Sequence, residues 1–152
     1  MTSIKSSEDP AVRFAKLMAE LFYFMTEELV DKLGDEEGKA AAQEAIRKFG
    51  EARVASMKNE AAERNLSLLD PQTYLKVRDM PSNGWESLPE NPGVTTVCPM
   101  CDIWDNFGEK GREFGALYCE VDHILFNGFG VKLDRPLCKT KGDSVCDFRL
   151  HI

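Results

Sequence analysis

Helical hydrophobic periodicity over the first 65 residues of this 152-residue chain constrains the fold more than any other feature. Asp9 followed by Pro10 indicates a helix start, because aspartate caps free N–H groups and proline suits the first helical position. Apolar residues then recur every three or four positions as far as Leu33, and Gly34 is favoured just beyond a helix end. We predict a helix over residues 10–33. It is apolar on nearly all sides, so we expect it to be central to the core.

A second long helix is predicted from Asp35 to about Asn65, and small residues, mainly alanines, predominate in it. Gly38 and Gly50 interrupt this pattern. A glycine inside a helix costs roughly 1 kcal/mol relative to alanine, so each glycine needs a structural reason. We expect both to mark places where a neighbouring element packs closely.

The remaining pattern predicts short elements in the order helix, loop, strand, helix and hairpin. Their expected ranges are a helix at 70–79, a loop at 80–93, a strand at 94–97, a helix at 111–129 and two strands at 131–139 and 145–152. This order predicts an α+β fold in which long N-terminal helices pack on a small antiparallel sheet with a C-terminal β-hairpin. We expect one domain over 1–152, made of a helical part (1–79) and a cysteine-containing strand–helix–hairpin part (80–152).

The formal net charge of −7 bears on partners and location. Nucleic-acid binding needs clustered lysine and arginine, and so does docking on anionic lipid, so we expect neither nucleic acid nor membrane as a partner. The first ten residues carry no apolar signal segment, which favours a cytoplasmic location where thiols stay reduced. The expected partner is a small-molecule ligand or substrate, and a homo-oligomer remains open.

All five cysteines lie in the second half of the chain, at positions 98, 101, 119, 138 and 146. Each can be read simply as a buried apolar residue. The Cys98-Pro-Met-Cys101 pair follows a predicted strand, as in a thioredoxin-type redox motif, and it also has the spacing of half a zinc site. The hairpin brings Cys138 and Cys146 near each other if the turn register permits. The candidate cofactors are therefore zinc or an iron–sulfur cluster, with Cys98, Cys101, Cys138 and Cys146 as ligands.

The segment from Tyr118 to His123 is the densest polar cluster in the sequence. On a helix, Cys119 shares a face with Asp122 and His123, at spacings of three and four residues. A thiol beside an imidazole is the minimal activated cysteine nucleophile, and a carboxylate can orient the ring. The alternative is a buried cysteine whose polar neighbours face solvent.

The candidate catalytic residues are therefore Cys119, Asp122, His123 and Cys146. Candidate substrate-binding residues are Tyr118 and Arg149, because an arginine presents a planar fork to a carboxylate. The alternative for Arg149 is an exposed strand residue.

Three segments resemble the L-2-amino-thiazoline-4-carboxylic acid hydrolase family, and the likeness covers nearly the whole chain. They are Ile46-Arg-Lys-Phe-Gly-Glu-Ala-Arg53, Cys119-Glu-Val-Asp122 and Gly142-Asp-Ser-Val-Cys-Asp-Phe-Arg149. The ending also resembles ligand-binding domains of the 4-vinyl reductase type, in which a Cys-x7-Cys pair supplies two zinc thiolates. Cys138 and Cys146 match that spacing, but Arg135 stands where an acidic ligand is expected.

The resemblance implies a hydrolase acting on non-peptide C–N bonds, which opens a cyclic C–N bond in a cysteine/aspartate pocket. For the family substrate, a thiolate from Cys119 or Cys146 would add to the electrophilic carbon of a thiazoline ring. Asp122 or His123 would move protons, and water would release an N-carbamoyl cysteine. Two alternatives are a non-enzymatic sensor or carrier that binds a metal or small ligand through its cysteines, and thiol redox exchange at Cys98 and Cys101.

Overall fold

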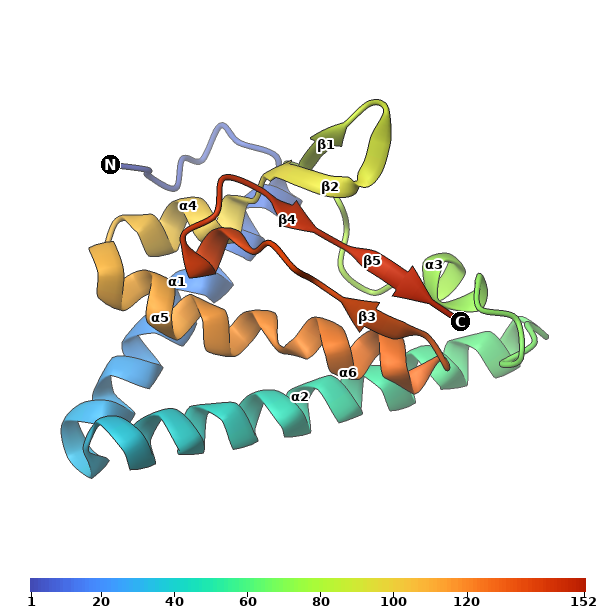
Figure 1. The fold of residues 1–152 in the computed structure, drawn as a ribbon, viewed down its shortest axis with the longest axis horizontal. Helices are drawn as coiled ribbons and strands as arrows, with labels where there is room; N and C mark the ends of the chain where they lie inside the picture. Colours follow the sequence, from blue (N-terminus) through green and yellow to red (C-terminus); the bar gives the residue numbers. More distant parts are fainter.

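The computed structural model describes all 152 residues, and its elements confirm the α+β fold with small antiparallel sheets (Figure 1). In chain order the elements are α1 (Pro10–Leu33), α2 (Asp35–Glu63), α3 (Thr73–Val77), β1 (Glu86–Leu88), β2 (Asn91–Val97), α4 (Pro99–Asp105), α5 (Gly108–Cys119), α6 (Val121–Gly128), β3 (Lys132–Asp134), the 3₁₀ helix η1 (Lys139–Lys141), β4 (Cys146–Asp147) and β5 (Arg149–His151).

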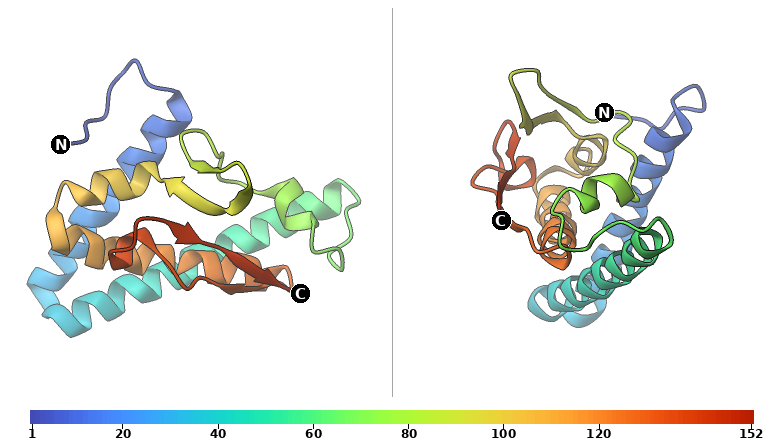
Figure 2. Two further views of the ribbon diagram at one scale, coloured as in Figure 1. Left: turned by 45° about the horizontal axis from the view of Figure 1, so that its top comes forward. Right: turned by 90° about the vertical axis from the view of Figure 1, so that its right-hand side faces the viewer.

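These elements form layers. The strands lie on one side of α4, α5 and α6, and α1 lies on the other side, with α2 running along the base (Figures 1 and 2). No helix is both long enough and apolar enough to cross a membrane.

The start of α1 is as predicted, because the Asp9 side chain accepts a hydrogen bond from the Ala11 N–H at 2.8 Å. The two glycines of α2 also have the expected role. A Cβ added to Gly38 would lie 2.5 Å from the Val30 Cα, and one added to Gly50 would lie 2.9 Å from the Ile124 side chain. The first glycine therefore lets α2 turn back closely against α1, and the second lets α6 pack on α2.

Trp104 and Phe114 are the largest fully buried side chains, each 1% exposed. The Trp104 ring donates from Nε1 to the Ala19 carbonyl at 2.9 Å, which ties α4 to α1. On its other side the ring lies against Gly115, where an added Cβ would come within 2.6 Å of Trp104 Cδ2. The Trp104 ring can therefore pack against α5 only because residue 115 is a glycine and has no side chain.

The predicted helix over 111–129 is two helices, because the chain breaks at Glu120 between α5 and α6. In an unbroken helix the Cys119 carbonyl would accept a bond from the His123 N–H. Here that carbonyl accepts from Arg135 Nη1 at 3.1 Å, and the His123 N–H bonds to the Glu120 carbonyl instead. A side chain distant in sequence thus competes with the helix ladder and ends α5.

The C-terminal hairpin is confirmed, but its two arms are not the long strands expected at 131–139 and 145–152. β3 pairs with β5, whereas β4 pairs with β2 in a separate sheet of order β1-β2-β4. The second arm changes partners at Phe148, whose N–H donates to the Gly93 carbonyl at 2.8 Å. Two further elements fall outside the predicted ranges. β1 lies in the predicted loop, and α4 begins at Pro99, inside the Cys98-Pro-Met-Cys101 motif.

Candidate functional site

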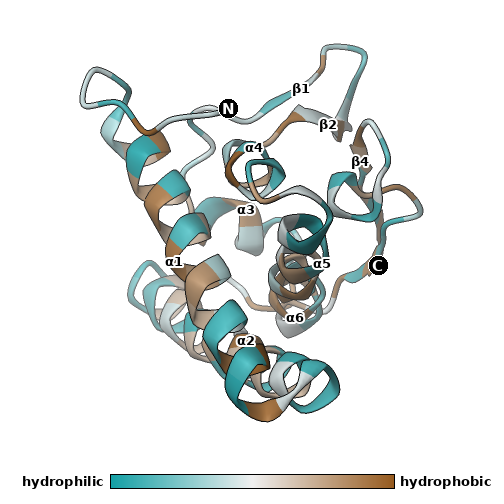
Figure 3. Cartoon of the chain, turned by 90° about the vertical axis from the view of Figure 1, so that its left-hand side faces the viewer, coloured by the Kyte–Doolittle hydropathy of each residue, from teal (hydrophilic) through white to brown (hydrophobic).

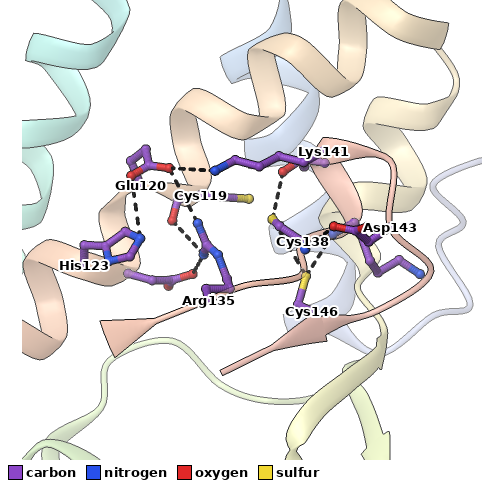
Figure 4. A network of polar contacts seen from close by, with 11 residues as sticks. Cys119, Glu120, His123, Arg135, Cys138, Lys141, Asp143 and Cys146 are labelled. Atoms are coloured by element: carbon purple, nitrogen blue, oxygen red, sulfur yellow. Dashed lines mark hydrogen bonds and ion pairs between the residues drawn. The ribbon is translucent and has the colours of Figure 1, made fainter. Parts of the chain in front are cut away.

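The candidate site lies where the α5–α6 break meets the C-terminal segment, and Arg135 is at its centre (Figure 4). The Arg135 side chain is only 2% exposed. Its Nη1 donates to the Asp122 carboxylate at 2.8 Å and to the Cys119 carbonyl at 3.1 Å. Its Nε and Nη2 are buried with no hydrogen-bond partner, although Glu120 lies 3.7 Å from Nη2. A buried guanidinium with two unsatisfied donors is an unusual feature that needs an explanation.

Asp122 is the carboxylate of this pair, and its side chain is 30% exposed. Burial raises the pKa of the Asp122 carboxyl, and the Arg135 charge opposes that increase. Asp122 therefore forms the boundary between the buried guanidinium and solvent, and its pKa is set by two effects of opposite sign.

Three thiols gather beside this ion pair. Cys138 precedes η1 and is 1% exposed, and its sulfur lies 4.0 Å from the Cys146 sulfur and 3.1 Å from the Thr140 hydroxyl oxygen. Figure 4 shows the Cys119 sulfur pointing toward Cys138 from the end of α5. Two backbone contacts hold the turn. The Cys138 N–H donates to Asp143 at 2.9 Å, and the Lys139 N–H donates to the Cys146 sulfur at 3.3 Å.

These contacts give the three thiols different acidities. Hydrogen bonding from Cys119 and then from Cys146 lowers the pKa of the Cys138 thiol, with further help from Thr140 and the Arg135 charge. The same hydrogen bonds raise the pKa of the Cys119 and Cys146 thiols, and burial raises both further. The arrangement favours one thiolate at Cys138, flanked by two protonated thiols.

The structure brings together three of the four candidate catalytic residues, Cys119, Asp122 and Cys146. His123 lies at the exposed edge of the same network: its side chain is 40% exposed, and its Nε2 lies 3.7 Å from Glu120, which also lies 3.7 Å from Arg135 (Figure 4). It therefore does not pair with the Cys119 thiol in the way that helical spacing suggested. Because the helix breaks after Cys119, residues before and after the break no longer share the helical face that a spacing of four residues predicts.

The two candidate substrate-binding residues lie outside this cluster of polar contacts. Arg149 is 60% exposed and pairs with Asp147 at 2.9 Å, as the alternative of an exposed strand residue predicted. Tyr118 is buried against Phe22 and Trp104, and its hydroxyl has no hydrogen-bond partner. Burial raises the pKa of the Tyr118 hydroxyl, so the group stays neutral.

The structure gives no support to the predicted metal site. No group of three or more histidine, cysteine, aspartate or glutamate side chains is arranged to hold a metal ion. Cys98 and Cys101 form their own pair at the start of α4, where the Cys101 N–H donates to the Cys98 sulfur at 3.4 Å. The Arg135 charge beside Cys138 also disfavours a divalent cation there. The residues present therefore do not fit zinc or an iron–sulfur cluster.

Sequence reasoning missed the central place of Arg135, and it considered Cys138 as a metal ligand or a buried residue but not as a candidate nucleophile. One sequence feature could have indicated the role of Arg135. Arg135 stands where an acidic metal ligand is expected, and a positive charge at that position binds an anion and not a metal ion. The thiolate at Cys138 depends on Thr140 and on neighbours from α5, so it was not visible from spacing alone.

A surface hollow of about 180 Å³ lies beside α2 and is lined by Phe49, Arg53, Asp79 and Met80. Arg53 and Asp79 form a two-pronged ion pair there, with contacts of 2.8 Å and 2.6 Å. None of the three thiols lines this hollow, so the thiol cluster and the hollow are separate features.

The fold and site define an α+β protein in which a thiol cluster adjoins a buried arginine–carboxylate pair. The sequence model of the L-2-amino-thiazoline-4-carboxylic acid hydrolase family matches residues 14–150. The chain therefore belongs to this family. Searches of curated proteins and of solved structures returned no significant match.

Proposed function

We propose that this protein is a thiol-dependent hydrolase of the family type, acting on a small cyclic substrate that carries an amidine-like C=N carbon and a carboxylate. The observation that carries the proposal is the cluster of Cys119, Cys138 and Cys146 beside the Arg135–Asp122 pair. Its hydrogen bonds favour a nucleophilic thiolate at Cys138, which distinguishes this thiol from Cys119 and Cys146. The thiolate is the reactive form of cysteine, and neighbouring donors stabilise it.

The reaction can be balanced with the family substrate. The Cys138 thiolate adds to the ring carbon of the C=N bond, and the ring nitrogen takes a proton from solvent. The ring carbon–sulfur bond then breaks, and the leaving sulfur is protonated by the Cys146 thiol. Water attacks the resulting enzyme-bound isothiourea carbon, and one of its protons passes to the Cys146 thiolate and the other to solvent. Cys138 then leaves as the thiolate, and the product is an N-carbamoyl cysteine. The atom balance thus requires attack at the C=N carbon and cleavage of the carbon–sulfur bond, not of the C–N bond expected from the sequence.

Arg135 and Asp122 have a supporting role in this scheme. The free Nε and Nη2 of Arg135 can stabilise an anion, either the substrate carboxylate or charge that develops during attack. Asp122 holds the guanidinium in place through Nη1 and has a raised pKa, which suits proton exchange with water during release of the product.

Access to the thiolate requires motion, because Cys138 is 1% exposed. The turn over residues 139–144 contacts Cys138 through Thr140 and Asp143, and it contains Gly142 in a left-handed conformation, with φ +96°. The turn is held by the Asp143 contact to the Cys138 N–H and by a 2.9 Å bond from Lys139 Nζ to the Thr96 carbonyl. We propose that outward movement of this turn admits the substrate.

The test is turnover of L-2-amino-thiazoline-4-carboxylate, followed by release of a free thiol. Cys138→Ser should lower kcat by about 10³-fold or more, because the serine hydroxyl is a much weaker nucleophile at neutral pH. Cys98→Ser is the matched control, since that thiol is also buried but belongs to the other pair, and it should keep the native rate. Unchanged turnover in Cys138→Ser would exclude the nucleophile, and absence of turnover in the native protein would exclude this substrate.

A further inference from the structure

One face of α1 leaves large apolar side chains in solvent, contrary to the expectation that this helix is central on all sides. The α1 stripe consists of Phe14, Leu17, Leu21, Phe24 and Met25, which are between 47% and 72% exposed. The opposite face of α1 is buried and carries mainly small residues, such as Ala15 and Ala19. Figure 3 views the molecule from a side on which α1 lies at the edge, with hydrophobic residues recurring along it.

The spacing of the α1 stripe is that of a helix-pairing seam. Phe14, Leu17, Leu21 and Phe24 are separated by three, four and three residues, which is the a/d pattern of a coiled coil. A seam of this kind packs knobs into holes on a second helix with the same pattern. A second copy of α1 supplies that pattern without any further partner.

The exposed area is sufficient for a modest interface. If each side chain offers about 200 Å² when fully exposed, the exposed fractions of the five residues leave roughly 570 Å² of the α1 stripe in solvent. The largest apolar patch on an ordinary monomer is about 300–600 Å² and is often functional. Two facing stripes would bury at most about 1,150 Å², just above the lower limit of about 1,000 Å² for a specific interface.

The charges at the two ends of the α1 stripe favour an antiparallel pair. Arg13 lies at its N-terminal end, and the buried Nε of Arg13 has no hydrogen-bond partner. Glu28, Asp31 and Lys32 lie at the C-terminal end and are exposed, and Lys32 pairs with Glu28 at 3.1 Å, so Asp31 gives that end its net negative charge. A parallel pair would oppose like charges, whereas an antiparallel pair brings Arg13 of each copy toward the acidic end of the other.

We propose that the α1 stripe is a homodimer interface, formed by two antiparallel copies of α1 related by a twofold axis near Leu21. The interface is isologous, so every contact occurs twice. It lies on the side of the molecule opposite the strands, and it leaves the thiol cluster free (Figure 2).

The test is sedimentation velocity over a range of concentrations with the full chain. We expect a monomer–dimer equilibrium with a dissociation constant on the order of 10 μM. Leu21→Glu places two carboxylates near the axis and should weaken association by about 100-fold or more. The matched control is Leu69→Glu, since Leu69 is 95% exposed but lies after α2, and it should dimerise like the native chain. Circular dichroism should show that both variants are folded.

Charge reversal tests the orientation. Arg13→Glu should weaken the dimer, and adding Asp31→Arg to the same chain should restore much of the loss, because each reversed charge again meets its opposite. Asp31 is chosen because Glu28 already pairs with Lys32 within the chain. A native chain that remains monomeric at about 0.5 mM overturns the proposal, since that is far above the expected dissociation constant. So does a dimer that survives Leu21→Glu. A monomer whose binding to neutral phosphatidylcholine vesicles is abolished by Leu21→Glu would assign the stripe to lipid and also overturn it.

Discussion

Replacing Arg135 with methionine tests the energetic role of the buried ion pair. Methionine keeps the apolar stem but leaves the Asp122 carboxylate and the Cys119 carbonyl without their donor. Removing one partner of a fully buried pair costs about 3–5 kcal/mol. Arg135 is 2% exposed but Asp122 is 30% exposed, so water partly solvates the remaining charge. We therefore expect a loss of about 2–3 kcal/mol in the free energy of unfolding at neutral pH.

The loss should depend on pH in a defined direction. Burial already raises the pKa of Asp122, and the variant removes the Arg135 charge that opposes this. A carboxyl whose pKa is higher in the folded state binds its proton more tightly there, so its unfavourable contribution grows as pH rises above the unfolded-state value. Acidification protonates Asp122 and relieves the uncompensated charge. The difference between variant and native protein should therefore be smaller at about pH 5 than at about pH 7.5.

Urea unfolding, monitored by tryptophan fluorescence at the two pH values, measures both effects. The matched control combines Arg135→Met with Asp122→Asn, which removes both charges and should recover part of the lost stability at the higher pH. The reasoning is refuted if Arg135→Met unfolds at the native urea concentration, or if its deficit is the same at both pH values.

Three further predictions concern the core, the surface and the tyrosines. Gly115→Ala should cost about 1–3 kcal/mol in urea unfolding, because its methyl group would overlap the buried Trp104 ring. Arg149→Ala should change stability by less than about 0.5 kcal/mol and leave turnover unchanged, because this exposed residue only pairs with Asp147. In an ultraviolet titration, less than half of the tyrosine absorbance change should occur by about pH 10. Burial raises the pKa of all three tyrosines, that of Tyr23 to about 12.

Local signals predicted the long helices correctly. The Asp9-Pro10 start and the Gly34 end are short-range features, and the helix bounds follow from them. Gly38 and Gly50 also had the expected role, because a glycine in a helix is unfavourable unless packing requires it. The α+β class followed from the order of elements.

The features that the sequence did not predict depend on contacts between residues far apart in the chain. The break at Glu120 results from Arg135 taking the Cys119 carbonyl, and nothing in the helical periodicity indicates this. The change of partner between β4 and β5 depends on β2, about fifty residues earlier. The sequence wrongly predicted α1 to be buried on nearly all sides. A helix face that packs on the core and one that is left exposed for a partner can carry the same apolar pattern.

The sequence predicted most of the residues that lie in the candidate site, but it did not predict the chemical role of each one. Cys119, Asp122 and Cys146 do lie in one network, joined through Arg135 and Cys138, but the thiol of this network with the lowered pKa is that of Cys138. Acidity depends on which thiol receives hydrogen bonds from its neighbours, and that is set by three segments that fold together. Sequence spacing gives the distances along the chain only.

The central claim is that Cys138 is a thiolate at neutral pH, and thiolate absorbance near 240 nm tests it directly. The difference spectrum between the native protein and Cys138→Ser should show one thiolate at about pH 7, and this signal should persist on moderate acidification, well below the ordinary cysteine pKa of about 8.5. The Cys98 thiol also has a lowered pKa, because of its hydrogen bond with Cys101, so it is not a suitable control. The control for loss of a buried, protonated thiol is Cys101→Ser, because hydrogen bonding with Cys98 and burial raise the pKa of the Cys101 thiol. If the Cys138 signal is absent at neutral pH and appears only above about pH 8, the thiol is ordinary and the proposed chemistry fails.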